Sequence, residues 1–207
     1  MSFTPKASIQ FIENSELGNT ETEFSFSVSG DFYYDLGAKI QLKSGFGIGN
    51  LATSQLDYSP LFGCDFDGNG GALQYNSYYK IAINSYYLEV PLKIKFKIIG
   101  EVNHVFIDFG IQNYFKINSS EKVKVYECGV YSFDLKNNSL FNHNEYLLTL
   151  NAGIGFESKL FKRQKLILEP VIEFALTKTY KEEEGILAST INNSKIMNLG
   201  LLLGIKF

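Results

Sequence analysis

The amino-acid sequence predicts an all-β protein: one antiparallel, up-and-down barrel of eight strands, closed by pairing of the first strand with the last. Three observations predict this fold. Apolar residues recur at every second position along most of the chain, which is the pattern of strands with one apolar face. The links between these stretches alternate between short and long. The length of 207 residues suits a single domain that covers 1–207.

The last segment, residues 195–207, shows the alternation best. Every odd position from Met197 to Phe207 carries a large apolar side chain. Most even positions are small or polar, with Ile196 and Leu202 as exceptions. A strand of this length that ends on an aromatic residue resembles the closing strand of a bacterial outer-membrane barrel.

Seven earlier segments alternate in the same way. They cover residues 6–13, 23–34, 38–49, 79–98, 104–117, 145–157 and 166–180. Two of them contain a proline, Pro91 and Pro170, which cannot donate a backbone hydrogen bond to a neighbouring strand. Because a closed barrel has no edge strand, we expect bulges or breaks in the hydrogen-bond ladder at both prolines.

The links between segments differ systematically in length. Short links cover residues 35–37, 99–103 and 160–164, and long links cover 14–22, 50–77, 118–144 and 181–193. This asymmetry is typical of outer-membrane barrels, which have short periplasmic turns and long outer loops. An even number of strands then places both termini in the periplasm and the long loops outside.

The two faces of the strands indicate how such a barrel would sit in lipid. A sheet inside a membrane must close on itself, because every backbone N–H and C=O group needs an internal partner. The apolar face would point to lipid, and the charged face would point into a lumen that side chains can fill in an eight-stranded barrel. We therefore expect a plugged, salt-bridged lumen and no continuous pore. The predicted lumen charges are Lys39, Lys43, Glu89, Lys93, Lys95, Asp108, Glu145, Glu169 and Glu173.

Composition excludes several other classes of protein. The net charge of −3 argues against a nucleic-acid-binding role, which requires a basic face. No run of 18 apolar residues exists, so we expect no transmembrane helix. The first five residues do not read as a signal peptide. Because an outer-membrane barrel must be exported, we expect that the numbering starts after a removed signal, or that Met1 was added for expression.

Three segments carry a resemblance to a known family. They are residues 86–96 (YYLEVPLKIKF), 150–157 (LNAGIGFE) and 199–207 (LGLLLGIKF). In these patterns the chain resembles the Bacteroidota outer-membrane β-barrel family, also called PorT-like. The resemblance implies an exported eight-stranded barrel but no single activity. PorT itself is tied to type IX secretion, and no functional residue can be carried over to this chain.

Residues 65–70 match the start of a calcium-binding loop. Asp65, Asp67 and Asn69 supply oxygen atoms at positions one, three and five, and Gly70 stands at the sharp turn. Position twelve is Asn76 rather than the usual bidentate Glu, so we expect any calcium to bind weakly. The alternative is an ordinary turn rich in Asp, Asn and Gly. We expect no other cofactor.

Two further features concern the long loops. Cys64 and Cys128 are the two cysteines and lie in loops on the same predicted side, where the oxidising envelope permits a disulfide. The alternative is two unpaired thiols. His143, with Ser139 and Glu145, could form the catalytic group of a lipid-modifying barrel enzyme, although nothing fixes their geometry.

These observations favour a non-enzymatic outer-membrane barrel that acts as a structural or partner-binding component of the cell envelope. Its expected partners are outer-membrane lipid and an envelope protein, with a link to a secretion or assembly complex as one form of that role. Two alternatives stay open, a lipid-modifying barrel enzyme and a soluble lipocalin-like barrel that binds a ligand inside an apolar cavity.

Overall fold

The protein is an antiparallel sheet of nine described strands. The computed structural model describes residues 2–13, 22–57, 78–100, 103–127, 130–135, 144–161, 163–177 and 195–207. Its strands are β1 (Ser2–Glu13), β2 (Thr22–Asp35), β3 (Ile40–Asp57), β4 (Tyr78–Ile99), β5 (His104–Glu127), β6 (Val130–Leu135), β7 (Tyr146–Lys159), β8 (Lys165–Ala175) and β9 (Lys195–Lys206). Within the described ranges, no helix is long and apolar enough to cross a membrane.

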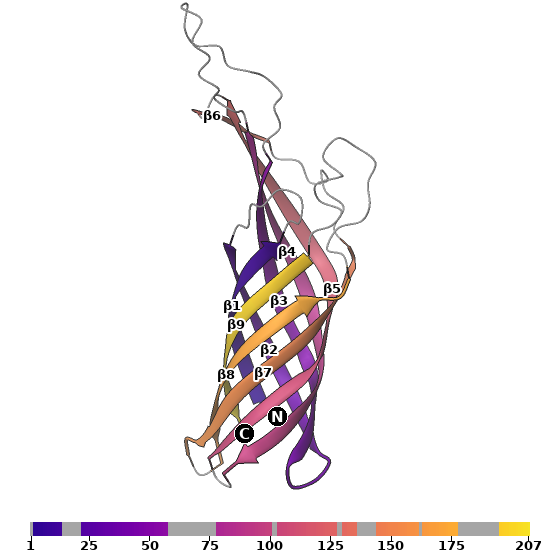
Figure 1. Ribbon diagram of the computed structural model, residues 1–207, viewed down its shortest axis with the longest axis vertical. Helices are drawn as coiled ribbons and strands as arrows, with labels where there is room; N and C mark the ends of the chain where they lie inside the picture. The colour runs from indigo at the N-terminus through magenta and orange to yellow at the C-terminus, as the bar shows by residue number, and fades with distance from the viewer. Residues whose placement is uncertain are drawn as a thin grey trace, which may run out of the picture.

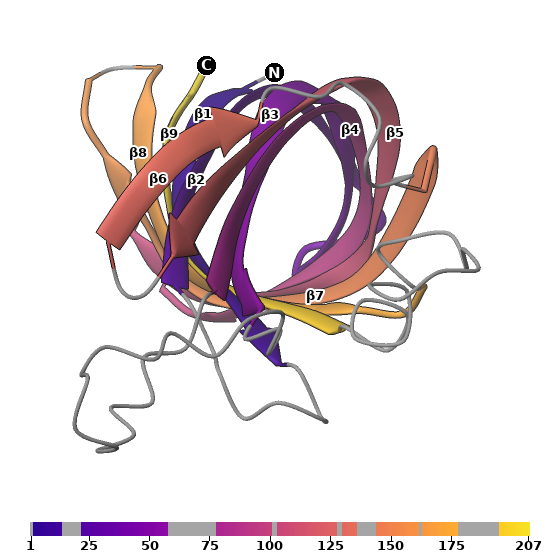
Figure 2. The same ribbon diagram turned by 90° about the horizontal axis from the view of Figure 1, so that it is seen from above.

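The strands follow one another up and down around a curved sheet (Figure 1). Strand pairing runs from β1 through β2, β3, β4 and β5 to β7, β8 and β9. Strand β9 also pairs with β1, between Ser2 with Lys206 and Glu13 with Lys195. Seen from above, the strands wrap around an interior, and both termini lie at one end of it (Figures 1 and 2). We call this end the terminal end.

Three strands continue beyond the rest of the sheet at the opposite end. Strands β3, β4 and β5 stay paired as far as Asp57 with Tyr79 and Tyr78 with Tyr126 (Figure 1). A short strand, β6, pairs with the end of β5. The alternation predicted links over these residues, at 50–77 and 118–144. The extension was not predicted, because polar stretches such as residues 118–121 show no alternation and are held by pairing with β4.

Three prolines coincide with gaps in the strand pairing. The β3–β4 register passes from Ser44 with Leu92 to Gly47 with Glu89, which leaves a gap at Pro91. The β7–β8 register passes from Gly153 with Val171 to Phe156 with Leu168, which leaves a gap at Pro170. The β1–β9 register has a similar gap at Pro5. Each proline remains paired with its other neighbour. The expected ladder breaks at Pro91 and Pro170 are therefore present, because proline has no N–H to donate.

The two faces of the sheet differ sharply in polarity. Leu199, Leu201 and Leu203 on β9 are 43%, 44% and 47% exposed on the outer surface. Lys43 and Lys95, on the enclosed side, are 2% and 1% exposed. A soluble lipocalin-like barrel has the opposite arrangement, with apolar side chains inside. The charged interior therefore argues against that alternative.

Candidate functional site

The buried ionisable side chains of the described part of the chain gather in the interior. Its lowest group, nearest the terminal end, is built around Glu157 on β7, which is fully buried. Glu157 Oε2 lies 2.7 Å from Lys95 Nζ and 3.1 Å from His104 Nε2. Glu157 Oε1 lies 3.4 Å from Lys165 Nζ and 3.6 Å from Lys206 Nζ. One carboxylate therefore contacts cationic or ionisable side chains from four other strands.

Aromatic rings complete the surroundings of Lys95. Its Nζ atom lies 3.5 Å from the centroid of the Phe106 ring and 5.3 Å from that of Tyr33. Lys206 Nζ lies 4.1 Å from the same Tyr33 ring. Aromatic faces attract ammonium groups most strongly where water is excluded. The rings therefore help to stabilise the lysines that Glu157 alone does not neutralise.

The middle group joins two lysines to three carboxylates. Lys43 Nζ lies 3.5 Å from Asp31 Oδ2 and 3.8 Å from Glu169 Oε2. Lys93 Nζ lies 3.8 Å from Glu169 Oε1 and 3.9 Å from Asp108 Oδ2. Lys43 and Lys93 are directly opposed on β3 and β4, an arrangement that is unfavourable for like charges. The shared carboxylate of Glu169 offsets that repulsion.

The upper group is held by neutral donors. Glu173 accepts hydrogen bonds from Tyr114 Oη at 2.8 Å, Asn151 Nδ2 at 2.5 Å and Asn198 Nδ2 at 3.2 Å. Glu89 accepts one from Gln112 Nε2 at 3.3 Å. Hydrogen bonds to an ionised carboxylate are among the strong ones in proteins. These contacts therefore tie β4, β5, β7, β8 and β9 together across the interior.

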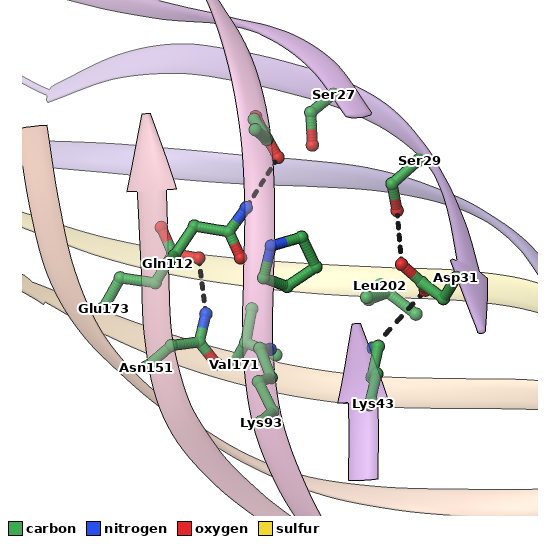
Figure 3. A pocket seen from close by; sticks show the side chains of 12 residues that line it. Ser27, Ser29, Asp31, Lys43, Lys93, Gln112, Asn151, Val171, Glu173 and Leu202 are labelled. Carbon is green, nitrogen blue, oxygen red and sulfur yellow. Dashed lines mark hydrogen bonds and ion pairs between the residues drawn. The ribbon is translucent and has the colours of Figure 1, made fainter. Parts of the chain in front are cut away.

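Two clusters of apolar side chains pack among the ionic groups. One cluster contains Leu51, Tyr87, Tyr114 and Leu147, toward the end opposite the termini. A second contains Phe106, Ile167 and Leu202. Between them, a polar cavity of about 20 Å³ lies beside Lys43, Gln112 and Glu173 (Figure 3). A space of this size holds about one water molecule.

The structure places most of the predicted interior charges in these groups. Seven of the nine are buried: Lys43, Glu89, Lys93, Lys95, Asp108, Glu169 and Glu173. Lys39 and Glu145 are exposed instead. Their prediction as lumen charges is wrong, because each precedes the first residue of its strand and so lies at an end of the barrel.

Several predicted sites lie outside the described residues. They are the calcium-loop residues Asp65, Asp67 and Asn69, the cysteines Cys64 and Cys128, and the pair Ser139 and His143. A weak calcium site and a disulfide therefore stay predictions. Within the ranges that the structure does describe, no three His, Cys, Asp or Glu side chains are placed to hold a metal ion.

The group around Glu157 was not predicted from the sequence. Neither Glu157 nor His104, whose imidazole lies beside it, was among the expected interior residues. A signal was present, because Glu157, Lys165 and Lys206 occupy the same alternating positions as the predicted interior charges of their strands. Alternation indicates that these side chains lie on the interior side of the sheet. It cannot show that they converge, because convergence depends on how far neighbouring strands are shifted along one another.

Comparisons with known proteins give a family and several distant structural likenesses. A search of curated proteins found no match. Among solved structures, Neisserial surface protein A is 11% identical, with a TM-score of 0.45, over 100% of this chain and 96% of that one. Ail, the attachment invasion locus protein of Yersinia pestis, is 10% identical, with a TM-score of 0.42, over 100% and 97%. The outer membrane enzyme PagL is 10% identical, with a TM-score of 0.41, over 100% of both chains.

These structural likenesses are too distant to carry an argument about function. The family match is more extensive, since residues 2–181 match the model of the outer membrane protein beta-barrel domain. The exposed apolar face and the ionic interior described above are what such a domain requires in a membrane. The chain therefore belongs to the family of outer membrane protein beta-barrel domains and is a β-barrel protein of the bacterial outer membrane.

Proposed function

We propose that this chain forms a closed eight-stranded barrel that does not conduct solutes and that serves as a structural or partner-binding component of the outer membrane. The termini and short turns face the periplasm, and the long loops and the extension of β3–β6 face outward. The PorT-like resemblance of residues 86–96 is consistent with a role beside a secretion or assembly complex.

The filled interior is the observation that carries this proposal. Lys43, Lys93 and Lys95 extend into it and contact carboxylates on strands that are not their neighbours. Removing one member of a buried ion pair is costly, because the remaining charge is left without compensation in a poorly polarisable environment. The interior side chains are therefore held in place, and the apolar clusters around Tyr87 and Phe106 occupy the interior among the described residues, which supports a barrel without a continuous pore.

Planar-bilayer conductance tests the closed interior. The purified barrel should give no stable channel at millimolar to molar salt. A triple variant in which Tyr87, Tyr114 and Leu147 become Ala serves as the positive control, because it removes one of the two apolar clusters. Channels of uniform conductance from the unaltered protein would contradict the proposal.

Partner binding is tested by co-purification. After extraction in a mild detergent, the barrel should bring down an envelope protein in a fixed ratio, identified by mass spectrometry. A barrel that always elutes alone would count against this role. For orientation, a protease added to intact cells should cut within residues 58–77 and leave the short turns intact.

We propose no catalytic role for this chain. The described carboxylates contact lysine, histidine, tyrosine and amide side chains that hold the barrel together. His143 tests the enzymatic alternative, because His143→Ala would abolish any acyl-chain release or transfer that the protein catalyses. Loss of such an activity in that variant would overturn the non-enzymatic proposal.

A further inference from the structure

Five lysines lie around the terminal end of the barrel. They are Lys39, Lys97, Lys159, Lys165 and Lys206. Each lies two positions from a buried residue that faces the interior: Gln41, Lys95, Glu157, Ile167 and Gly204, respectively. Because side chains alternate along a strand, Lys97, Lys159, Lys165 and Lys206 occupy the interior side of the sheet. Lys39 precedes β3 and lies at the rim, where its carbonyl is paired with Lys97. We call these five residues the basic mouth.

The strand register brings these lysines next to one another. Lys165 on β8 is directly opposite Lys159 on β7 and Lys206 on β9. The backbone N–H of Lys97 donates to the carbonyl of Lys39 at 2.8 Å. Like charges directly opposed across strands destabilise a sheet. The arrangement therefore lowers the stability of the sheet. The stability of the fold does not explain why lysines occupy these positions.

The basic mouth has little negative charge to neutralise it. Among the side chains described at the terminal end, Glu157 contacts Lys165 and Lys206, and a second carboxylate, Asp35, stands at the end of β2. Glu157 is fully buried and also contacts Lys95 at 2.7 Å. Asp35 accepts a hydrogen bond from Gln41 Nε2 at 2.6 Å. Lys165 is 34% exposed, and Lys39 and Lys159 are exposed, so much of this positive charge faces water.

Two features restrict what could bind there. Four of the five mouth lysines lie on the interior side of the sheet and so face away from lipid, which disfavours a membrane headgroup. Among the described side chains, the cluster of Phe106, Ile167 and Leu202 packs in the interior beyond them, which favours binding at the mouth over passage through it. The ligand must therefore carry several negative charges and approach along the barrel axis from the aqueous side.

We propose that the basic mouth docks an acidic segment of a partner protein, with several Asp or Glu carboxylates contacting the lysine ring. This inference rests on the proposed partner-binding function and names the chemistry of that partner. The carboxylates of the acidic segment supply the negative charge that the basic mouth lacks. Lys206 Nζ, which lies over the Tyr33 ring, and Lys165 Nζ, beside it on β8, supply the innermost contacts.

The test uses a fluorescent hexaglutamate peptide and the full chain in a micelle of uncharged detergent. Fluorescence anisotropy should show saturable binding that weakens as salt is raised, since salt screens exposed charges. Lys39→Gln with Lys159→Gln, and separately Lys165→Gln with Lys206→Gln, should each weaken binding about tenfold, as expected for two lost ion pairs. Lys122→Gln with Lys124→Gln, on the β5 extension at the opposite end, is the matched control and should leave binding unchanged.

Folding of each variant is checked by gel mobility with and without boiling, because closed outer-membrane barrels usually migrate differently in the two states. Glu157 is paired with Lys95, His104, Lys165 and Lys206, so the variant of Lys39 and Lys159 is the one that leaves the interior group intact. Equal weakening by the control variant, or no saturable binding, would overturn the inference.

Two further outcomes would also overturn it. Inorganic phosphate that competes at the same concentration as the peptide would indicate a simple anion site. Binding that requires vesicles with anionic lipid would indicate a headgroup site. If the barrel conducts no ions but the peptide does not bind, only this inference fails. If the barrel conducts ions, the proposed closed interior fails.

Discussion

Lys95 Nζ and Glu157 Oε2 lie 2.7 Å apart, and both side chains are at most 1% exposed. The two residues are 62 positions apart in sequence and stand on β4 and β7, which are separated by β5. Their contact crosses the interior rather than following the sheet. It makes the ionic group at the terminal end a brace between strands that are not hydrogen-bonded to each other.

The first prediction concerns this brace. Glu157→Gln keeps the size of the side chain but leaves Lys95 and its neighbouring lysines without their carboxylate. Breaking a buried ion pair on one side typically costs about 3–5 kcal/mol of the free energy of unfolding. Urea titration of the barrel in lipid vesicles, followed by tyrosine fluorescence, measures this loss.

The control for that experiment is Asp35→Asn, a carboxylate at the exposed end of β2, which should cost less than about 1 kcal/mol. The double variant Glu157→Gln with Lys95→Met should recover part of the loss, because it removes the uncompensated charge. If Glu157→Gln unfolds at the same urea concentration as the unaltered protein, the brace does not contribute to stability.

The second prediction separates a buried hydrogen bond from an exposed one. Tyr114→Phe keeps the ring within the cluster of Leu51, Tyr87 and Leu147 but removes the donor to Glu173. Because that hydrogen bond goes to a buried carboxylate, its loss should cost about 1.5–3 kcal/mol of the free energy of unfolding. The measurement is again urea titration in lipid vesicles.

Tyr146→Phe is the matched control for Tyr114→Phe. Its hydroxyl donates to Asn113 Oδ1 at the same 2.8 Å but at an exposed position. The expected cost is about 1 kcal/mol or less, because water can replace the lost partner. If both variants lose the same free energy of unfolding, burial does not strengthen the hydrogen bond between Tyr114 and Glu173.

The third prediction concerns the close packing of Phe106 over Gly155. The two residues are directly opposed on β5 and β7, and a Cβ atom at Gly155 would overlap the Phe106 ring. Gly155→Ala should therefore lower the free energy of unfolding by about 1–3 kcal/mol through overpacking. Thermal unfolding in detergent, followed by circular dichroism, detects the change.

Two companion variants decide whether the Phe106 ring causes that loss. Gly155→Ala combined with Phe106→Leu should be less destabilised than the sum of the two single changes, because the obstructing ring is gone. Gly37→Ala, where an added Cβ meets open space, should be nearly neutral. Strict additivity of the first pair would indicate that the ring and the new methyl group do not meet.

The fourth prediction tests which surface faces lipid. Leu201 is 44% exposed and lies opposite Pro170 on the outer face of β8 and β9. Leu201→Arg should lower the free energy of unfolding in lipid vesicles by about 2–4 kcal/mol, the cost of a cation at the middle of a bilayer.

The matched comparison is Ile99→Arg, at the end of β4, where the side chain is 70% exposed. There the cost should fall to about 0–1 kcal/mol, because the cation reaches the interface. A Leu201→Arg variant that refolds into vesicles as stably as the unaltered protein would contradict a lipid-facing position for that surface.

The sequence by itself determined the strands and the polarity of their two sides. Alternation is a local property with a period of two, so it identified residues 195–207 as a strand and placed Leu199, Leu201 and Leu203 together on the apolar side. The missing N–H of proline is equally local, which is why ladder breaks at Pro91 and Pro170 could be predicted.

Tertiary structure alone decided which charges meet. Glu157, Lys95 and Lys206 come from β7, β4 and β9, and their convergence depends on the stagger between strands, which no single segment encodes. The same is true of the extension formed by β3, β4, β5 and β6, whose polar residues are held by partners and not by a periodic pattern. The contacts that join distant strands follow from register, and register is set only when the whole sheet has assembled.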